Sequence, residues 1–232
     1  MAREKSSEPD RKLKEILIVS GGPVADLRLL KQRIDRADPE AIICADGGAR
    51  HLLELGLVPQ VVIGDMDSLP ETDQTELMAA GCRILQHSRR KDETDTELAL
   101  RYALEQKPDA IEIYGALGGR IDHTLANISL LALAARAETR TILVDGKTTL
   151  FVVSEKAEIK GITGEIVSLF PLTTEVGGIT LEGFEYPLLE ATMEVGKPYG
   201  VSNRLLGQEG IIFVKRGLLL VVKTGEVEPL SV

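Results

Sequence analysis

The feature that most constrains this chain is the alternation, up to residue 145, of short apolar runs with longer segments of helical spacing. Six runs have the length of buried strands: Glu15 to Ser20, Ala41 to Ala45, Gln60 to Gly64, Cys82 to Gln86, Ala110 to Tyr114 and Arg140 to Asp145. Helical spacing lies between them, most clearly in Ala25 to Arg36, Asp95 to Gln106 and Asp122 to Arg136. Because parallel strands are joined by crossovers, usually helices, this order predicts a parallel sheet with helices on both faces.

The pattern changes after Asp145. Twelve of the 22 glycines follow that residue, and no long helical pattern occurs there. The apolar runs are strand-like: Thr148 to Val153, Glu165 to Leu169, Ile211 to Lys215 and Leu218 to Val222. The residues where the last two runs meet, around Lys215 to Gly217, predict a tight hairpin. This half of the chain is typical of a small antiparallel sandwich.

We therefore predict an α/β fold in which an N-terminal parallel-sheet α/β domain is followed by a small antiparallel β-sandwich domain. The predicted bounds are 1–14 for a charged N-terminal arm, 15–145 for the α/β domain and 146–232 for the sandwich.

Composition excludes several classes of partner. The net charge is −9 and aromatic residues make up only 3% of the chain, so a nucleic-acid partner is not expected. The longest apolar stretches, such as Leu218 to Val222, are far too short to span a bilayer, and residues 1–14 lack the apolar segment of a secretory signal. Two cysteines, Cys44 and Cys82, cannot form a disulfide framework. We expect a cytoplasmic protein without a membrane partner.

Glycines and acids follow the predicted strands, at the edge where open parallel sheets bind ligands. The segments are Ser20-Gly21-Gly22-Pro23, Asp46-Gly47-Gly48, Gly64-Asp65-Met66-Asp67-Ser68, Lys91-Asp92-Glu93-Thr94-Asp95 and Gly115 to His123. Most of them also have a simple structural explanation. The glycine pairs could be no more than tight turns, and Thr94 with Glu97 has the spacing of a helix capping box.

Asp65 and Asp67 are not explained by turns or caps. Two carboxylates directly after an apolar strand repel one another, an arrangement that usually needs a cation. With oxygen ligands only, the predicted cation is Mg²⁺. Because Mg²⁺ commonly binds through one or two carboxylates and phosphate oxygens, the sequence predicts a phosphate-bearing substrate.

Taken together, in this order and spacing, five segments resemble the thiamine pyrophosphokinase (thiamine diphosphokinase) family in its bacterial form. They are Cys44-Ala45-Asp46-Gly47-Gly48-Ala49, Gly64-Asp65-Met66-Asp67-Ser68, Lys91-Asp92-Glu93-Thr94-Asp95-Thr96-Glu97, Gly118-Gly119-Arg120-Ile121-Asp122-His123 and Ser202-Asn203. The resemblance implies transfer of pyrophosphate from ATP to the hydroxyethyl group of thiamine, giving thiamine diphosphate and AMP. It also implies a catalytic domain at 15–145, a thiamine-binding domain at 146–232, and a homodimer whose active sites are shared between subunits.

The resemblance further implies roles for individual residues. Asp65, Asp67 and Asp95 are similar to the family's Mg²⁺ ligands. Arg120 would be a charge clamp on the transferring phosphates, and Asp122 a further catalytic acid near them. The ATP and phosphate side would include Gly21, Gly22, Asp46, Gly47, Lys91, Asp92 and Thr94, and the thiamine side Ser202 and Asn203.

Some alternatives stay open at this stage. Animal and fungal members of the family have a Trp near the thiamine ring; this chain has none, and Tyr199 or Phe184 could replace it. Either Asp95 or Asp122 could accept the proton of the attacking hydroxyl. Two other functions also fit parts of the pattern. A metal-dependent phosphoesterase is one, because Asp-rich strand ends suit two-metal hydrolysis, and a non-catalytic nucleotide or thiamine sensor is the other.

Overall fold

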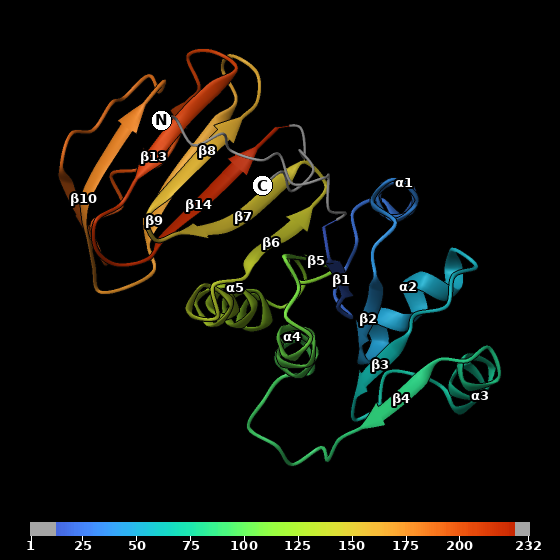
Figure 1. Ribbon diagram of the computed structural model, residues 1–232. Coiled ribbons are helices and arrows are strands. Elements are labelled where there is room, and N and C mark those ends of the chain that lie inside the picture. Colours follow the sequence, from blue (N-terminus) through green and yellow to red (C-terminus); the bar gives the residue numbers. More distant parts are fainter. Residues whose placement is uncertain (1–12, 226–232) are drawn as a thin grey trace, which may run out of the picture.

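The computed structural model describes residues 13–225 (Figure 1). The predicted charged arm therefore lies almost wholly outside the described residues. Its last residue, Lys14, is held by its backbone amide, which donates to Asp109 Oδ2 at 2.7 Å, and by its ammonium group, which donates to the Gln106 carbonyl at 2.8 Å.

Strands and helices alternate through the first part of the described chain. In order they are β1 (Glu15–Val19), α1 (Leu27–Ala37), β2 (Ala41–Ala45), a 3₁₀ turn η1 (Asp46–Gly48), α2 (Ala49–Glu54), β3 (Val61–Gly64), α3 (Glu71–Ala79), β4 (Arg83–Gln86), α4 (Asp95–Glu105), β5 (Ala110–Tyr114), α5 (Ile121–Arg136) and β6 (Arg140–Asp145). The six predicted strands are thus found, with small differences at their ends.

Only strands follow β6 within the described residues. They are β7 (Thr148–Val153), β8 (Lys156–Lys160), β9 (Ile166–Pro171), β10 (Glu175–Glu182), β11 (Ala191–Glu194), β12 (Asn203–Arg204), β13 (Glu209–Phe213) and β14 (Leu219–Thr224). Together with the alternating part, they confirm the predicted fold class.

The strands form two sheets. One has ten strands in the order β12-β9-β14-β7-β6-β5-β1-β2-β3-β4, and the other has four in the order β11-β10-β13-β8. Strands β1 to β6 pair in parallel, whereas β7 pairs with β6 antiparallel, Asp145 opposite Thr148. The predicted division at residue 145 therefore falls inside a continuous sheet, at the hairpin where strand direction changes. The domain bounds themselves stay a prediction.

Helices cover both faces of the parallel strands (Figure 1). Leu100 of α4 and Leu131 of α5 pack on one face with Ile18, while Leu30 of α1 and Leu52 of α2 pack on the other with Leu17. Successive residues of β1 thus enter opposite cores, as the two-residue period of a strand requires. The helices hold the sheet rigid and leave its carboxyl edge to the loops.

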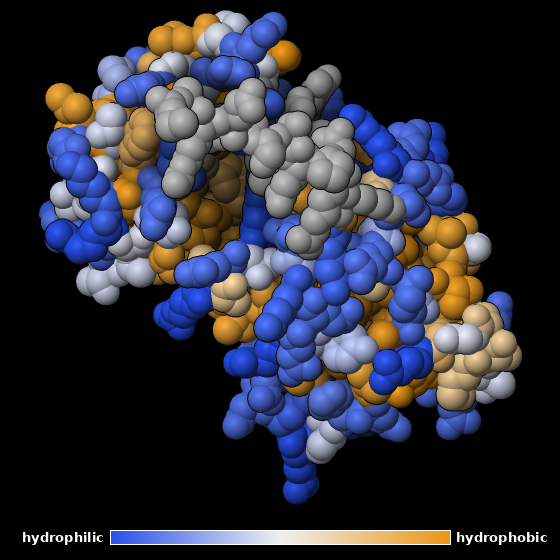
Figure 2. Space-filling model, viewed as in Figure 1, coloured by the Kyte–Doolittle hydropathy of each residue, from blue (hydrophilic) through white to orange (hydrophobic). Residues whose placement is uncertain are grey.

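The antiparallel half encloses a third core. Val167, Leu169 and Val221 of the large sheet face Ile179 and Ile212 of the small one. Over the visible face of the α/β half, hydrophilic side chains cover most of the surface and apolar ones gather in patches (Figure 2). Among the described helices, none is long and apolar enough to cross a membrane.

The hairpin predicted at Lys215 to Gly217 is wrong. Strand β13 pairs with β8 and β10, whereas β14 pairs with β7 and β9, so this segment crosses from one sheet to the other. The backbone amides of Lys215 and Arg216 both donate to the Gly177 carbonyl, at 3.1 Å each. Pairing with distant β10 therefore replaces the expected local pairing.

Candidate active site

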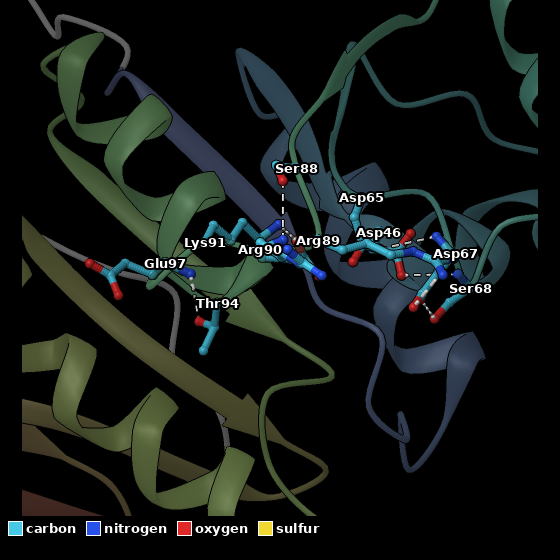
Figure 3. Close-up of polar contacts among 11 residues, drawn as sticks. Asp46, Asp65, Asp67, Ser68, Ser88, Arg89, Arg90, Lys91, Thr94 and Glu97 are labelled. Atoms are coloured by element: carbon cyan, nitrogen blue, oxygen red, sulfur yellow. Dashed lines mark hydrogen bonds and ion pairs between the residues drawn. The ribbon is translucent and has the colours of Figure 1, made fainter.

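Three carboxylates meet at the carboxyl edge of the sheet, in the loops that follow β2 and β3 (Figure 3). Oxygens of Asp46, Asp65 and Asp67 all lie within 4.8 Å of one another. We call these three residues the acidic cluster. The Asp67 amide donates to Asp65 Oδ1 at 3.1 Å, and the Ser68 hydroxyl donates to Asp67 Oδ1 at 3.0 Å. These local bonds fix the turn that presents both acids after the apolar strand.

Asp46 is the buried member of the acidic cluster. Asp46 is only 6% exposed. Its Oδ2 accepts from the Ser68 amide at 3.3 Å, and its Oδ1 has no hydrogen-bond partner among the described residues. Burial raises the pKa of the Asp46 carboxyl; the Ser68 hydrogen bond opposes this rise and the charge of Asp95 adds to it. A buried carboxylate oxygen without a partner is costly unless a ligand or ion satisfies it.

The acidic cluster fits a hard divalent cation. Its donors are all carboxylate oxygens, which suit Mg²⁺ rather than a softer transition metal. The cluster supplies negative charge for such a cation, and a bound cation would satisfy the unpartnered Oδ1 of Asp46. Sequence reasoning placed Asp46 on the phosphate side, whereas the structure brings it together with Asp65 and Asp67.

Asp95, the third predicted ligand, lies beside the acidic cluster at the start of α4. A Cβ on Gly64 would lie 2.8 Å from Asp46 Cβ and 3.1 Å from Asp95 Oδ1, so both acids pack closely over that glycine. Lys91 donates to Asp95 Oδ1 in a partly buried ion pair. The metal role of Asp95 stays a prediction.

The predicted helix cap at Thr94 is confirmed. Its hydroxyl oxygen accepts from the Glu97 amide at 3.1 Å and begins α4 (Figure 3). This cap orients the first turn of the helix and hence Asp95. Asp92, two residues before Thr94, is exposed.

The glycine loops after β1, β2 and β5 pack backbone to backbone. A Cβ on Gly48 would lie 2.0 Å from the Val19 carbonyl oxygen, and one on Gly22 would lie 2.5 Å from that of Gly115. The Gly22 amide already donates to the Gly115 carbonyl at 2.9 Å. Glycine is thus needed here for close packing of loops. Among the glycines predicted on the ATP and phosphate side, Gly21 and Gly47 lie beside one another at this edge.

Arg120 and Asp122 lie at the start of α5 and bind one another. The guanidinium donates to both carboxylate oxygens, at 2.6 and 3.1 Å, and both side chains are exposed. Their loop follows β5, two strands from β2. A spacing of about 4.8 Å per strand puts that loop about 10 Å from the loop that carries Asp46. The two residues therefore do not belong to the acidic cluster but border the same edge.

Ser202 and Asn203 lie at the opposite end of the large sheet, in and before β12. Seven strands separate β12 from β3, which corresponds to about 38 Å at the usual strand spacing. Asn203 is only 5% exposed: its amide nitrogen donates to the Tyr186 carbonyl at 2.8 Å and its oxygen accepts from the Tyr186 amide at 3.0 Å. Within one chain the two predicted halves of the site do not meet.

Two residues near these sites were missed by sequence reasoning. Arg89, in the loop before α4, makes an ion pair with Asp67 at 3.8 Å, and Tyr186 is an exposed aromatic held by Asn203. The run Arg89-Arg90-Lys91 was a visible signal for the first. The second has no local signal, because Tyr186 and Asn203 are 17 residues apart in sequence.

A cavity of about 1060 Å³ opens elsewhere, where the end of α5 and the start of β6 face β7 and β8. Arg136, Arg140 and Lys160 are among the residues that line it, and none of the predicted site residues does. The candidate active site is instead an open edge formed by loops.

Two family models match this chain. Residues 32–144 match the catalytic domain of thiamin pyrophosphokinase, and residues 151–219 match the vitamin B1 binding domain of thiamin pyrophosphokinase. The chain is also 32% identical over 215 residues to thiamine pyrophosphokinase of Bacillus subtilis, a match that covers 91% of this chain and 99% of the relative.

Solved structures agree with these matches. The crystal structure of the Bacillus subtilis thiamine pyrophosphokinase has a TM-score of 0.81 at 29% identity, covering 92% of this chain and all (100%) of that one. The enzyme from Geobacillus thermodenitrificans has a TM-score of 0.77 at 30% identity, covering 93% and 100%. The fold, the two matched models and the relative that aligns over almost its whole length agree, and the chain belongs to the thiamine pyrophosphokinase family.

Proposed function

We propose that this chain transfers pyrophosphate from ATP to the hydroxyl of thiamine, giving thiamine diphosphate and AMP, and that its acidic cluster binds the Mg²⁺ that accompanies ATP. Membership of the thiamine pyrophosphokinase family supports the reaction. The observation that carries the site assignment is the cluster of three carboxylates with one buried, unpartnered oxygen on Asp46.

The residues of the sheet edge divide the work of binding the polyphosphate. Asp46, Asp65 and Asp67 would hold the metal, which neutralises phosphate charge when bound. Gly21 and Gly47 would let the polyphosphate approach the loop backbone, and Arg120, which borders the same edge, would bind its phosphate oxygens.

Proton transfer is a minor part of the proposed chemistry. Hydrogen bonding from Arg120 lowers the pKa of Asp122 to about 2, which makes this carboxylate a weak base. Asp95 is held by Lys91. Attack of an alcohol on phosphorus depends mainly on alignment and charge neutralisation, so neither acid needs to be a strong base.

We further propose that the working unit is a homodimer with shared sites. The predicted thiamine residues lie about 38 Å from the acidic cluster in one chain, so a second chain has to bring them together. Exposed apolar side chains that a partner would cover lie at the start of α5, which borders the acidic edge, and around Asn203. Ile121 and Leu125 of α5 are 75% and 61% exposed, and Tyr186, Val201 and Leu206 around Asn203 are 62%, 46% and 62% exposed.

The reaction is tested by incubating the protein with Mg²⁺, thiamine and ATP labelled at the β-phosphorus. The expected products are AMP and labelled thiamine diphosphate, separated by chromatography. Thiamine monophosphate with ADP would indicate an ordinary kinase, inorganic phosphate alone a phosphoesterase, and no turnover a sensor.

The metal assignment is tested by Asp65→Asn. Loss of one carboxylate that would hold the charge-neutralising Mg²⁺ should lower kcat on the order of 10²-fold or more, while far-UV circular dichroism stays unchanged. Asp35→Asn is the matched control, because Asp35 is an exposed acid on α1 that pairs only with Lys31 among the described residues. Activity of Asp65→Asn within a few-fold of wild type would refute the assignment.

A further inference from the structure

The loop between β4 and α4 carries three consecutive basic residues beside the acidic cluster. Arg89 extends toward Asp67, with 3.8 Å between its Nη2 and the Asp67 Oδ2 (Figure 3). Lys91 pairs with Asp95 instead. The Arg90 amide donates to the Ser88 hydroxyl at 3.1 Å, and its side chain makes no ion pair with any residue in the described range.

Arg89 and Lys91 differ in how firmly they are held. The Arg89 side chain is 71% exposed, whereas that of Lys91 is 14% exposed and pairs with Asp95, four residues further along the chain. An exposed ion pair is weak and breaks easily, because water solvates both charges. Lys91 is thus a fixed part of the site, and Arg89 is a cation that can leave.

Charge explains why a cation lies at this position. Three carboxylates within 4.8 Å repel one another, and a guanidinium at Asp67 lowers that repulsion. A divalent cation at the cluster would repel the same guanidinium. A polyphosphate bound to that cation would attract it, because guanidinium groups match phosphate oxygens in geometry and charge.

We propose that Arg89 is an exchangeable counter-ion: it neutralises the acidic cluster before metal binds, then changes partner to the polyphosphate of ATP. This inference rests on the proposed metal site. Its consequence is that Arg89 acts with opposite sign on two ligands. It weakens binding of the metal alone and strengthens binding of the metal–nucleotide complex, which favours loading of both together.

The test measures Mn²⁺ binding without nucleotide, by electron paramagnetic resonance of the free ion, for wild type, Arg89→Gln and Arg90→Gln. Arg90→Gln removes the same charge from the next residue and is the matched control. Arg89→Gln should bind Mn²⁺ roughly two- to fivefold more tightly than Arg90→Gln, the size expected for one exposed ion pair. In steady-state assays at saturating Mg²⁺, Arg89→Gln should raise the KM for ATP about tenfold, as loss of a charged hydrogen bond predicts.

The outcomes separate this inference from the proposal that it rests on. Equal Mn²⁺ affinity in the two variants, or an unchanged KM for ATP in Arg89→Gln, would overturn the exchange. Absence of Mn²⁺ binding at the cluster in all three proteins, shown by no difference from Asp65→Asn, would refute the metal site itself. A rise of both metal affinity and ATP affinity in Arg89→Gln would also contradict the exchange, because the exchange predicts tighter metal binding and weaker ATP binding in this variant.

Discussion

At the scale of single residues, Asn203 supports its neighbours rather than pointing outward. Its side chain accepts from the amides of Tyr186 and Arg204 and donates to the Tyr186 carbonyl. A buried amide with these three bonds has little capacity left for a ligand. The structure also separates the two aromatic candidates of the sequence. Phe184 is 2% exposed and belongs to the core, whereas Tyr199 is 52% exposed. Tyr186, which the sequence did not suggest, is the exposed aromatic residue whose backbone Asn203 holds.

We expect Tyr186 to contact the cationic ring of thiamine. Tyr186→Ala should raise the KM for thiamine about tenfold and leave the KM for ATP unchanged, the loss expected for one cation–π contact. Tyr186→Phe, which keeps the ring, should stay within a few-fold of wild type. Tyr199→Ala is the control at the same end of the sheet. If Tyr199→Ala rather than Tyr186→Ala impairs thiamine use, Tyr186 is the wrong aromatic.

Among the secondary-structure elements, the sequence predicted those that depend on interactions between neighbouring residues. The cap at Thr94, the apolar runs of β1 to β6 and the start of α4 follow from neighbouring residues, and the structure contains them. Helices α2 and α3 were not predicted, because the first has only six residues and the second buries only Leu77.

Long-range contacts explain the predictions that were wrong or incomplete. The hairpin predicted at Lys215 is wrong because the amides of Lys215 and Arg216 donate to the carbonyl of Gly177, far away in sequence. The grouping of Asp46 with Asp65 likewise depends on the pairing of β2 with β3.

The close packing of the glycine loops can be tested by adding a single methyl group. Gly22→Ala should lower the free energy of unfolding by about 1–3 kcal/mol, because its Cβ would lie 2.5 Å from the Gly115 carbonyl oxygen and force the loops apart. It should also raise the KM for ATP, since the same loops form the sheet edge. Gly207→Ala is the control, because nothing lies within 4 Å of the Cβ it would add. Urea unfolding measures the free energy of unfolding of both variants, and steady-state assays measure the KM for ATP. Equal stability of the two variants would show that the loops are not tightly packed.

At the scale of the whole molecule, one ten-stranded sheet connects the two halves. The acidic cluster lies at its parallel end and the predicted thiamine residues at its antiparallel end, with seven strands between β3 and β12. A rigid sheet cannot fold back to join them. In the proposed dimer, each active site therefore combines the acidic cluster of one chain with the Tyr186 and Ser202 surface of another.

Mixing two defective proteins tests directly whether the active sites are shared between chains. One carries Asp65→Asn and the other carries Tyr186→Ala with Ser202→Ala, and both are assayed at thiamine concentrations well below the wild-type KM. After co-refolding in equal amounts, about half of the dimers are mixed, and each mixed dimer has one site with both lesions and one with neither. Shared sites should therefore restore about a quarter of wild-type activity. If each site were built within one chain, every site would keep a lesion, and confirmed heterodimers with no recovered activity would contradict the shared-site account.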